Sequence, residues 1–151
     1  MLRKEVYYNT IIVLMEVSVG TYLILLVESD DNAMSMMQRC ICNYSPDIEL
    51  VSTSTTGAAL ELLQRNNYDI VICDAFLLHE DRISFIRDMC DKTAFFLIII
   101  TGDTGITAES FTAYLKESYI HHVLYKPLQL QAFLESLRCA ILRVKVRREE
   151  S

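Results

Sequence analysis

The sequence predicts an α/β domain built on a parallel sheet of five strands, with helices on both faces of the sheet. Five short apolar runs recur along the chain, beginning at residues 22, 48, 70, 95 and 122, so that their starts lie 26, 22, 25 and 27 residues apart. Each interval leaves room for one helix, and strands that alternate with helices at this spacing form βαβ units. The predicted strands are Tyr22–Val27, Ile48–Ser52, Ile70–Cys73, Phe95–Thr101 and His122–Tyr125.

The intervals between these runs carry helical periodicity. After Asp31, apolar side chains are spaced i, i+3, i+4, i+7 and i+8, which is the pattern of a helix with one buried face. These side chains are Ala33, Met36, Met37, Cys40 and Ile41. Similar patterns predict four more helices, over Thr55–Asn66, Asp81–Cys90, about Ala108–Glu117 and Leu128–Val144.

The character of each run predicts its place in the sheet. The runs that begin at residues 22, 70 and 95 are apolar on both faces, which is typical of central strands in a parallel sheet. Ile48–Ser52 is mixed and His122–Tyr125 contains two histidines, so both suit the edges. The resulting strand order is 2-1-3-4-5, that of a flavodoxin-like (βα)5 doubly wound sheet.

Length and composition limit the function classes. A chain of 151 residues with 52% apolar residues forms one compact domain. The net charge of −6 argues against general binding of nucleic acid, which requires a basic surface. The five cysteines are odd in number, and Cys40-x-Cys42 has no second pair of zinc ligands. We expect reduced, mostly buried thiols in a cytoplasmic protein.

The first twenty residues need a separate interpretation. Residues 10–27 contain a single charge, Glu16, which suits a transmembrane segment, but polar residues interrupt the run and its last third suits a core strand. A soluble extension is therefore favoured over a membrane segment. The expected organisation is an N-terminal extension over 1–20, a domain over 21–142 and a basic C-terminal tail over 143–151 that frays beyond the last helix.

Polar residues follow the predicted strands where each strand ends. In an open parallel sheet, ligands bind outside the carboxyl ends of the strands, next to the switch in strand order. We therefore expect one shared site that combines carboxylates, a hydroxyl and an ammonium group. The residues concerned are Glu28-Ser29-Asp30-Asp31, Asp74, Thr101-Gly102-Asp103 and Lys126-Pro127.

Four segments in this order, LILLVESDD, YDIVICDAFLLHED, FLIIITGD and VLYKPL, resemble the receiver domain of two-component response regulators, including the chemotaxis regulators. The resemblance covers about residues 21–142. It implies that Asp74 accepts a phosphoryl group from a phosphohistidine and that the domain then signals through a conformational change. It also implies a Mg²⁺ ion held by Glu28, Asp74 and the backbone carbonyl of Phe76.

The resemblance assigns roles to two further residues and names the partners. Lys126 would reach the phosphoryl oxygens, the Thr101 hydroxyl would bond one of them, and the Lys126–Pro127 peptide bond would be cis. The implied partners are a histidine kinase or histidine phosphotransfer protein and a downstream effector protein. The resemblance also allows a homodimer, and it implies no direct contact with nucleic acid or membrane.

The sequence departs from the family pattern in ways that keep a second reading open. Ser29 stands where the family has a second acidic metal ligand, so Mg²⁺ affinity should fall unless Asp30 takes its place. Asp30 and Asp31 could instead only cap the first helix. Val123 replaces an aromatic residue that changes rotamer in many receivers. The alternative is a pseudo-receiver, a protein-interaction module that works without phosphorylation. A flavin protein is disfavoured, because VESDDN offers acids where a phosphate cradle needs glycines and hydroxyls.

Overall fold

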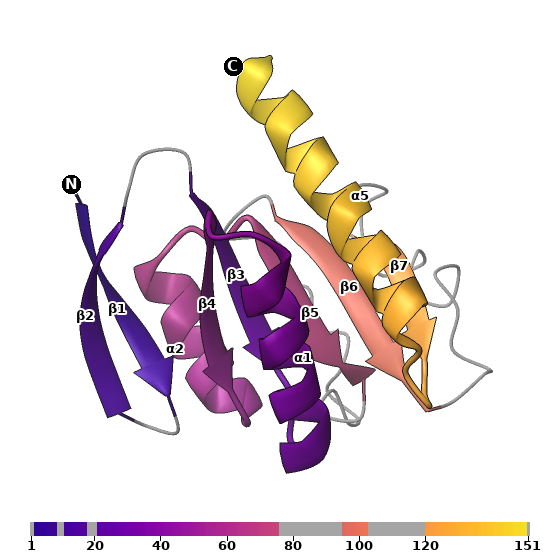
Figure 1. Ribbon diagram of the computed structural model, residues 1–151. Coiled ribbons are helices and arrows are strands. Elements are labelled where there is room, and N and C mark those ends of the chain that lie inside the picture. The colour runs from indigo at the N-terminus through magenta and orange to yellow at the C-terminus, as the bar shows by residue number, and fades with distance from the viewer. Residues whose placement is uncertain (1, 9–10, 18–20, 76–94, 103–119, 151) are drawn as a thin grey trace.

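The computed structural model describes the chain except for residues 1, 9–10, 18–20, 76–94, 103–119 and 151. Its main sheet has five parallel strands in the order β4-β3-β5-β6-β7 (Figure 1). This arrangement confirms the predicted 2-1-3-4-5 order and all five predicted strands. Their bounds are β3 (Tyr22–Val27), β4 (Ile48–Thr53), β5 (Ile70–Asp74), β6 (Phe96–Thr101) and β7 (Ile120–Tyr125).

Helices α1 (Asp31–Tyr44), α2 (Thr56–Arg65) and α5 (Leu130–Glu149) confirm three of the predicted helices. Side-chain caps fix the starts of the first two helices. The Asp30 carboxylate accepts a hydrogen bond from the Ala33 N–H at 2.7 Å, and the Thr55 hydroxyl accepts one from the Ala58 N–H at 3.2 Å. The helices predicted over 81–90 and 108–117 lie outside the described residues.

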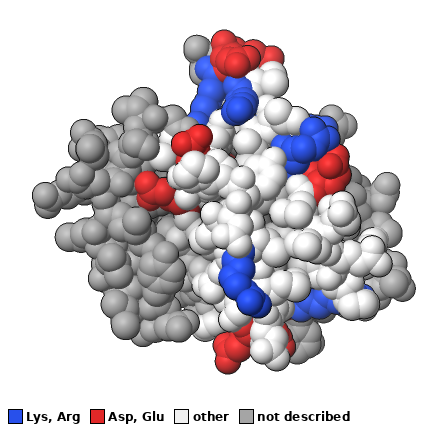
Figure 2. Space-filling model, viewed as in Figure 1, with Lys and Arg blue, Asp and Glu red and all other residues white. Residues whose placement is uncertain are grey.

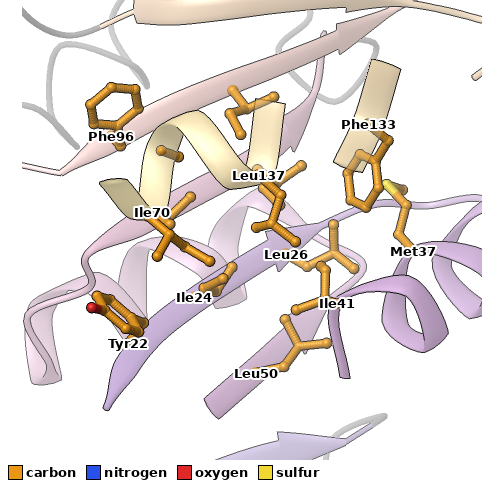
Figure 3. Close-up of a cluster of buried hydrophobic side chains, with 14 of the residues drawn as sticks. Tyr22, Ile24, Leu26, Met37, Ile41, Leu50, Ile70, Phe96, Phe133 and Leu137 are labelled. Atoms are coloured by element: carbon orange, nitrogen blue, oxygen red, sulfur yellow. The ribbon is translucent and has the colours of Figure 1, made fainter. Parts of the chain in front are cut away.

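The core has two layers because successive side chains of each central strand point to opposite faces of the sheet. One layer packs Leu25 and Val71 against α2. The other packs Ile24, Leu26 and Ile70 against α1 and α5 (Figure 3). Side chains on both faces of β3, β5 and β6 are buried, which is why these strands read as continuous apolar runs.

The outer face formed by α1 and α5 is mostly uncharged at its centre, with charged side chains nearer its rim (Figure 2). A groove of about 630 Å³ runs between the two helices. Its lining includes Met36, Cys40, Tyr44, Leu130 and Leu134.

The end of α5 differs from the expectation. The helix continues through Glu149, so the prediction that the basic tail frays was wrong. Arg148 holds the last turn in place: its guanidinium donates to the Thr21 carbonyl at 2.8 Å and to the Asp69 carboxylate at 3.0 Å, and it lies 4.7 Å from the centre of the Tyr22 ring. These contacts fasten the helix to the amino end of β3.

The N-terminal residues form an antiparallel hairpin of β1 (Leu2–Tyr8) and β2 (Ile11–Val17), which was not predicted. Leu2 pairs with Val17 at one end and Tyr8 with Ile11 at the other. The hairpin lies next to β4, the edge strand of the main sheet (Figure 1). No helix in the described part of the chain is long and apolar enough to cross a membrane.

The cysteines are less buried than expected. Cys73 is buried in the core, but Cys40 and Cys139 are only partly buried and Cys42 is exposed. All four are free thiols, and Cys90 lies outside the described residues. The expectation of mostly buried thiols was therefore wrong for three of the four cysteines that the structure describes.

Candidate functional site

The parallel register brings the predicted site residues to the carboxyl edge of the sheet. Val27, which precedes Glu28, pairs with Cys73, which precedes Asp74. Thr101 ends β6 and pairs with the residue before Lys126. The Lys126 N–H also donates to the Thr101 carbonyl at 2.8 Å. Four strands, β3, β5, β6 and β7, therefore end on one small surface.

The ammonium group of Lys126 joins the two carboxylates. Its Nζ lies 3.1 Å from Glu28 Oε1 and 3.1 Å from Asp74 Oδ2. The Glu28 and Asp74 side chains are 0% and 4% exposed, whereas Lys126 is 33% exposed. Two carboxylates can be buried side by side because one cation, reached by water from outside, pairs with both of them.

Burial beside a second carboxylate changes the proton affinity of Glu28. Burial raises the pKa of Glu28 to about 7, the neighbouring Asp74 carboxylate adds to the rise, and Lys126 partly opposes it. Partial burial acts to lower the pKa of Lys126, but hydrogen bonds to Asp74 and Glu28 outweigh it, so this pKa is raised. The charge of Glu28 therefore changes near neutral pH.

The acidic residues after Glu28 do not complete a three-carboxylate site. Ser29 is exposed, and the Asp30 carboxylate is engaged as the N-cap of α1. Asp31 is the first residue of that helix. Within the described residues, no group of three or more histidine, cysteine, aspartate or glutamate side chains could hold a metal ion together.

The remaining carboxylate ligands, Glu28 and Asp74, nevertheless fit a Mg²⁺ ion that keeps most of its water. Glu28 Oε2 is buried and has no hydrogen-bond partner, so this carboxylate oxygen is available as a metal ligand. Mg²⁺ is commonly bound through only one or two carboxylates plus water. Glu28 and Asp74 supply this number. Phe76, whose carbonyl is the third expected ligand, lies outside the described residues.

Three other predicted features lie next to the carboxylates: the Thr101 hydroxyl, the Lys126–Pro127 bond and Gly102. Thr101 is buried at the end of β6, beside the strand that leads to Lys126. The Lys126–Pro127 peptide bond is cis, as the resemblance implied. A Cβ added at Gly102 would meet no atom of the described residues within 4 Å.

Solved structures with the same fold include several receiver domains. The chain aligns with the signal receiver domain of an HD domain-containing protein from Pseudomonas fluorescens at 24% identity and a TM-score of 0.70, covering 91% of this chain and 98% of the other. A response regulator receiver domain protein from Clostridium thermocellum aligns at 20% identity and a TM-score of 0.67, covering 83% and 98%. A receiver domain from Methylobacillus flagellatus aligns at 15% identity and a TM-score of 0.65, covering 81% and 99%.

The chain therefore has the fold of the response regulator receiver domains, as its sequence motifs indicated. No protein-family model matches the sequence, and no curated protein matches it either.

Proposed function

We propose that the chain is a phosphoacceptor receiver domain of a response regulator. In this function Asp74 takes a phosphoryl group from a phosphohistidine donor in a Mg²⁺-dependent reaction, and the domain signals through a conformational change. The observation that carries the proposal is the position of Lys126, whose ammonium group bonds two buried carboxylates at the carboxyl ends of neighbouring strands.

The proposed transfer uses groups of this chain in three roles. An Asp74 carboxylate oxygen attacks phosphorus, an O–P bond forms, and the P–N bond of phosphohistidine breaks with its electron pair left on the imidazole nitrogen. Lys126 and the Thr101 hydroxyl donate hydrogen bonds to the phosphoryl oxygens. Water later attacks the acyl phosphate at phosphorus, which releases inorganic phosphate and restores the Asp74 carboxylate.

Glu28 and Asp74 would hold the Mg²⁺ ion, with the Phe76 carbonyl proposed as a further ligand. When bound, Mg²⁺ supplies positive charge that offsets repulsion between the phosphoryl group and the carboxylates. Because Ser29 is neutral and Asp30 caps α1, we propose a weaker metal site than one with three carboxylates.

The proposed donor is a histidine kinase or a histidine phosphotransfer protein, and the proposed recipient of the signal is an effector protein. Both would meet this chain in the cytoplasm. The chemistry supports this choice, because a phosphohistidine presents its phosphoryl group on a nitrogen leaving group that an aspartate can displace.

Acetyl phosphate, a small phosphodonor, tests the proposal without a cognate kinase. Incubation of the chain with acetyl phosphate and Mg²⁺ should add the mass of one phosphoryl group, as seen by intact-protein mass spectrometry. Removal of Mg²⁺ by a chelator and the variant Asp74→Asn should each prevent the gain. A gain that persists in Asp74→Asn would contradict the assignment of Asp74.

The second candidate is a pseudo-receiver that binds partners without phosphorylation. The neutral Ser29 and the engagement of Asp30 as a helix cap favour it. In this case Lys126 would stay paired with both carboxylates permanently. Beryllofluoride, which mimics an aspartyl phosphate, separates the two candidates. NMR shifts at Asp74 and Thr101 on addition of Mg²⁺ and beryllofluoride support the phosphoacceptor, and an unchanged spectrum supports the pseudo-receiver.

A further inference from the structure

The N-terminal hairpin lies beside β4 but belongs to a separate sheet. β4 is an edge strand of the main sheet, and β1 lies beside it (Figure 1). Among the described residues the two strands are nevertheless not joined in one sheet, because there β1 pairs with β2 alone and the five-stranded sheet ends at β4. The hairpin therefore lies against the edge of the sheet without extending its ladder.

The backbone groups on the outer edge of β4 can be identified. The carbonyl of Asp47 accepts a hydrogen bond from Tyr22, and that of Thr53 accepts one from Glu28, so both residues direct their backbone groups toward β3. The N–H and C=O groups of a strand alternate in direction from one residue to the next. The backbone groups that face away from β3 are thus those of Ile48, Leu50 and Ser52, and of these the Ile48 N–H already donates to the Ser45 carbonyl at 3.4 Å.

An outer edge of this kind readily pairs with another strand. β4 has six residues and a single charged side chain, Glu49, whereas natural sheets protect their edges with charges, prolines, bulges or a covering segment. A covering segment is the device present here. An isolated two-stranded hairpin is only marginally stable in water, so it also needs the surface on which it lies.

We propose that the β1–β2 hairpin covers the edge of β4, and that displacement of the hairpin allows β4 to pair with β4 of a second copy of this chain. The two copies are related by a two-fold axis, as in most homodimers, so the paired strands run antiparallel. The result is one continuous sheet that crosses the dimer. This interface is separate from the phosphorylation site and does not depend on the proposed function.

The directions of the backbone groups fix the register of this pairing. Residues joined by hydrogen bonds in an antiparallel ladder must both face the partner strand, so Ile48 lies opposite Ser52 and Leu50 lies on the two-fold axis. The Ile48 carbonyl accepts from the Ser52 N–H of the second copy, while the Ile48 N–H keeps its bond to Ser45. Between these pairs, Glu49 lies opposite Val51. No like charges meet in this register, and each copy presents the same surface to the other. The strand is therefore complementary to itself.

The test breaks the hairpin within the full-length chain. The N–H groups of Ile12 and Val13 point in opposite directions, so one of the two faces β1. Proline at both positions therefore removes one donor from the β1–β2 ladder. A milder variant with glycine at Val6 and Val13, which are opposite each other, weakens the same ladder without removing a donor. Gln131→Pro is the control, because proline is tolerated in the first turn of α5.

We expect the wild-type chain and Gln131→Pro to be monomeric by light scattering, and the hairpin variants to double in mass as concentration rises. The glycine variant should dimerise less than the proline variant. In the dimer, hydrogen exchange should slow at the Leu50 and Ser52 amides. The further variant Ser52→Pro, added to the hairpin variants, removes an outward N–H and should restore the monomer.

Three results would overturn the proposal. The first is a hairpin variant that keeps the circular dichroism spectrum of a folded chain and stays monomeric at every concentration. The second is a dimer in which the Leu50 and Ser52 amides exchange as they do in the monomer, since the copies would then meet through another face. The third is an equal degree of dimerisation in the wild type, because the hairpin would then protect nothing.

Discussion

Replacement of Glu28 by glutamine should stabilise the fold at alkaline pH relative to acidic pH. The pKa of Glu28 rises from 4.5 to about 7 on folding, chiefly through burial. Between these values the folded chain keeps a proton that the unfolded chain has released, so the free energy of unfolding falls as pH rises through this window. Glutamine cannot lose a proton and does not contribute this decrease.

The size of the effect follows from the rise in pKa. At about 1.4 kcal/mol per pH unit, the rise from 4.5 to about 7 corresponds to an upper limit of about 3.5 kcal/mol. Lys126 is 33% exposed, so water reaches the carboxylates and screens them. We therefore expect the stability of Glu28→Gln relative to wild type to increase by about 1 to 2 kcal/mol between about pH 5 and about pH 8.

Urea denaturation followed by circular dichroism measures this difference at the two pH values. The comparison across pH removes any constant effect of the substitution on packing. Glu61→Gln, at an exposed glutamate of α2, is the matched control and should show no comparable increase. A Glu28→Gln difference that stays constant or decreases toward alkaline pH would refute the argument that burial beside Asp74 holds a proton on Glu28.

Two other predictions test the start of α1 and the cysteines. Asp30→Ala should reduce the free energy of unfolding by about 1 kcal/mol, since it removes the cap of α1, while Asp31→Ala should cost only a few tenths as a charge in the first turn. Equal losses in urea denaturation would argue against the cap. A thiol reagent should modify the exposed Cys42 first and Cys73 only on unfolding, because Cys73 is buried and burial raises the pKa of its thiol. Modification of Cys73 in the native state, detected by peptide mass spectrometry, would contradict this order.

The main sheet could be predicted from the sequence because its signals are local. A strand buried on both faces must be apolar at every position, so Ile70–Cys73 and its counterparts stand out along the chain. The site followed from the same signals, since Asp74 and Lys126 directly follow apolar runs that a parallel sheet brings to one edge. Lys126 accordingly contacts both Glu28 and Asp74, although 98 residues separate it from the first and 52 from the second.

The features that were not predicted depend on contacts between particular residues, which a local sequence pattern does not reveal. The last turn of α5 is held by Arg148, whose two acceptors lie 127 and 79 residues away in the chain, whereas the periodicity of residues 143–148 gave no sign of them. Ile11–Val17 is apolar enough for several structures, and only its pairing with Leu2–Tyr8 makes it a strand. That Asp30 caps α1 follows from its bond to the Ala33 N–H, which the acidic run Glu28-Ser29-Asp30-Asp31 alone did not decide.

Because α5 is held at both ends, a tilt at its first turn acts on the contacts of its last turn. Its 20 residues begin just after the cis Lys126–Pro127 bond, and its last turn is fastened at Thr21. At 1.5 Å per residue the helix is about 30 Å long, so a tilt of roughly 5° about its first turn displaces its far end by about 2.6 Å. That displacement is close to the 2.8 and 3.0 Å lengths of the Arg148 hydrogen bonds. A slight movement beside Lys126 would thus strain the Arg148 contacts at the opposite edge of the sheet, where β3 begins.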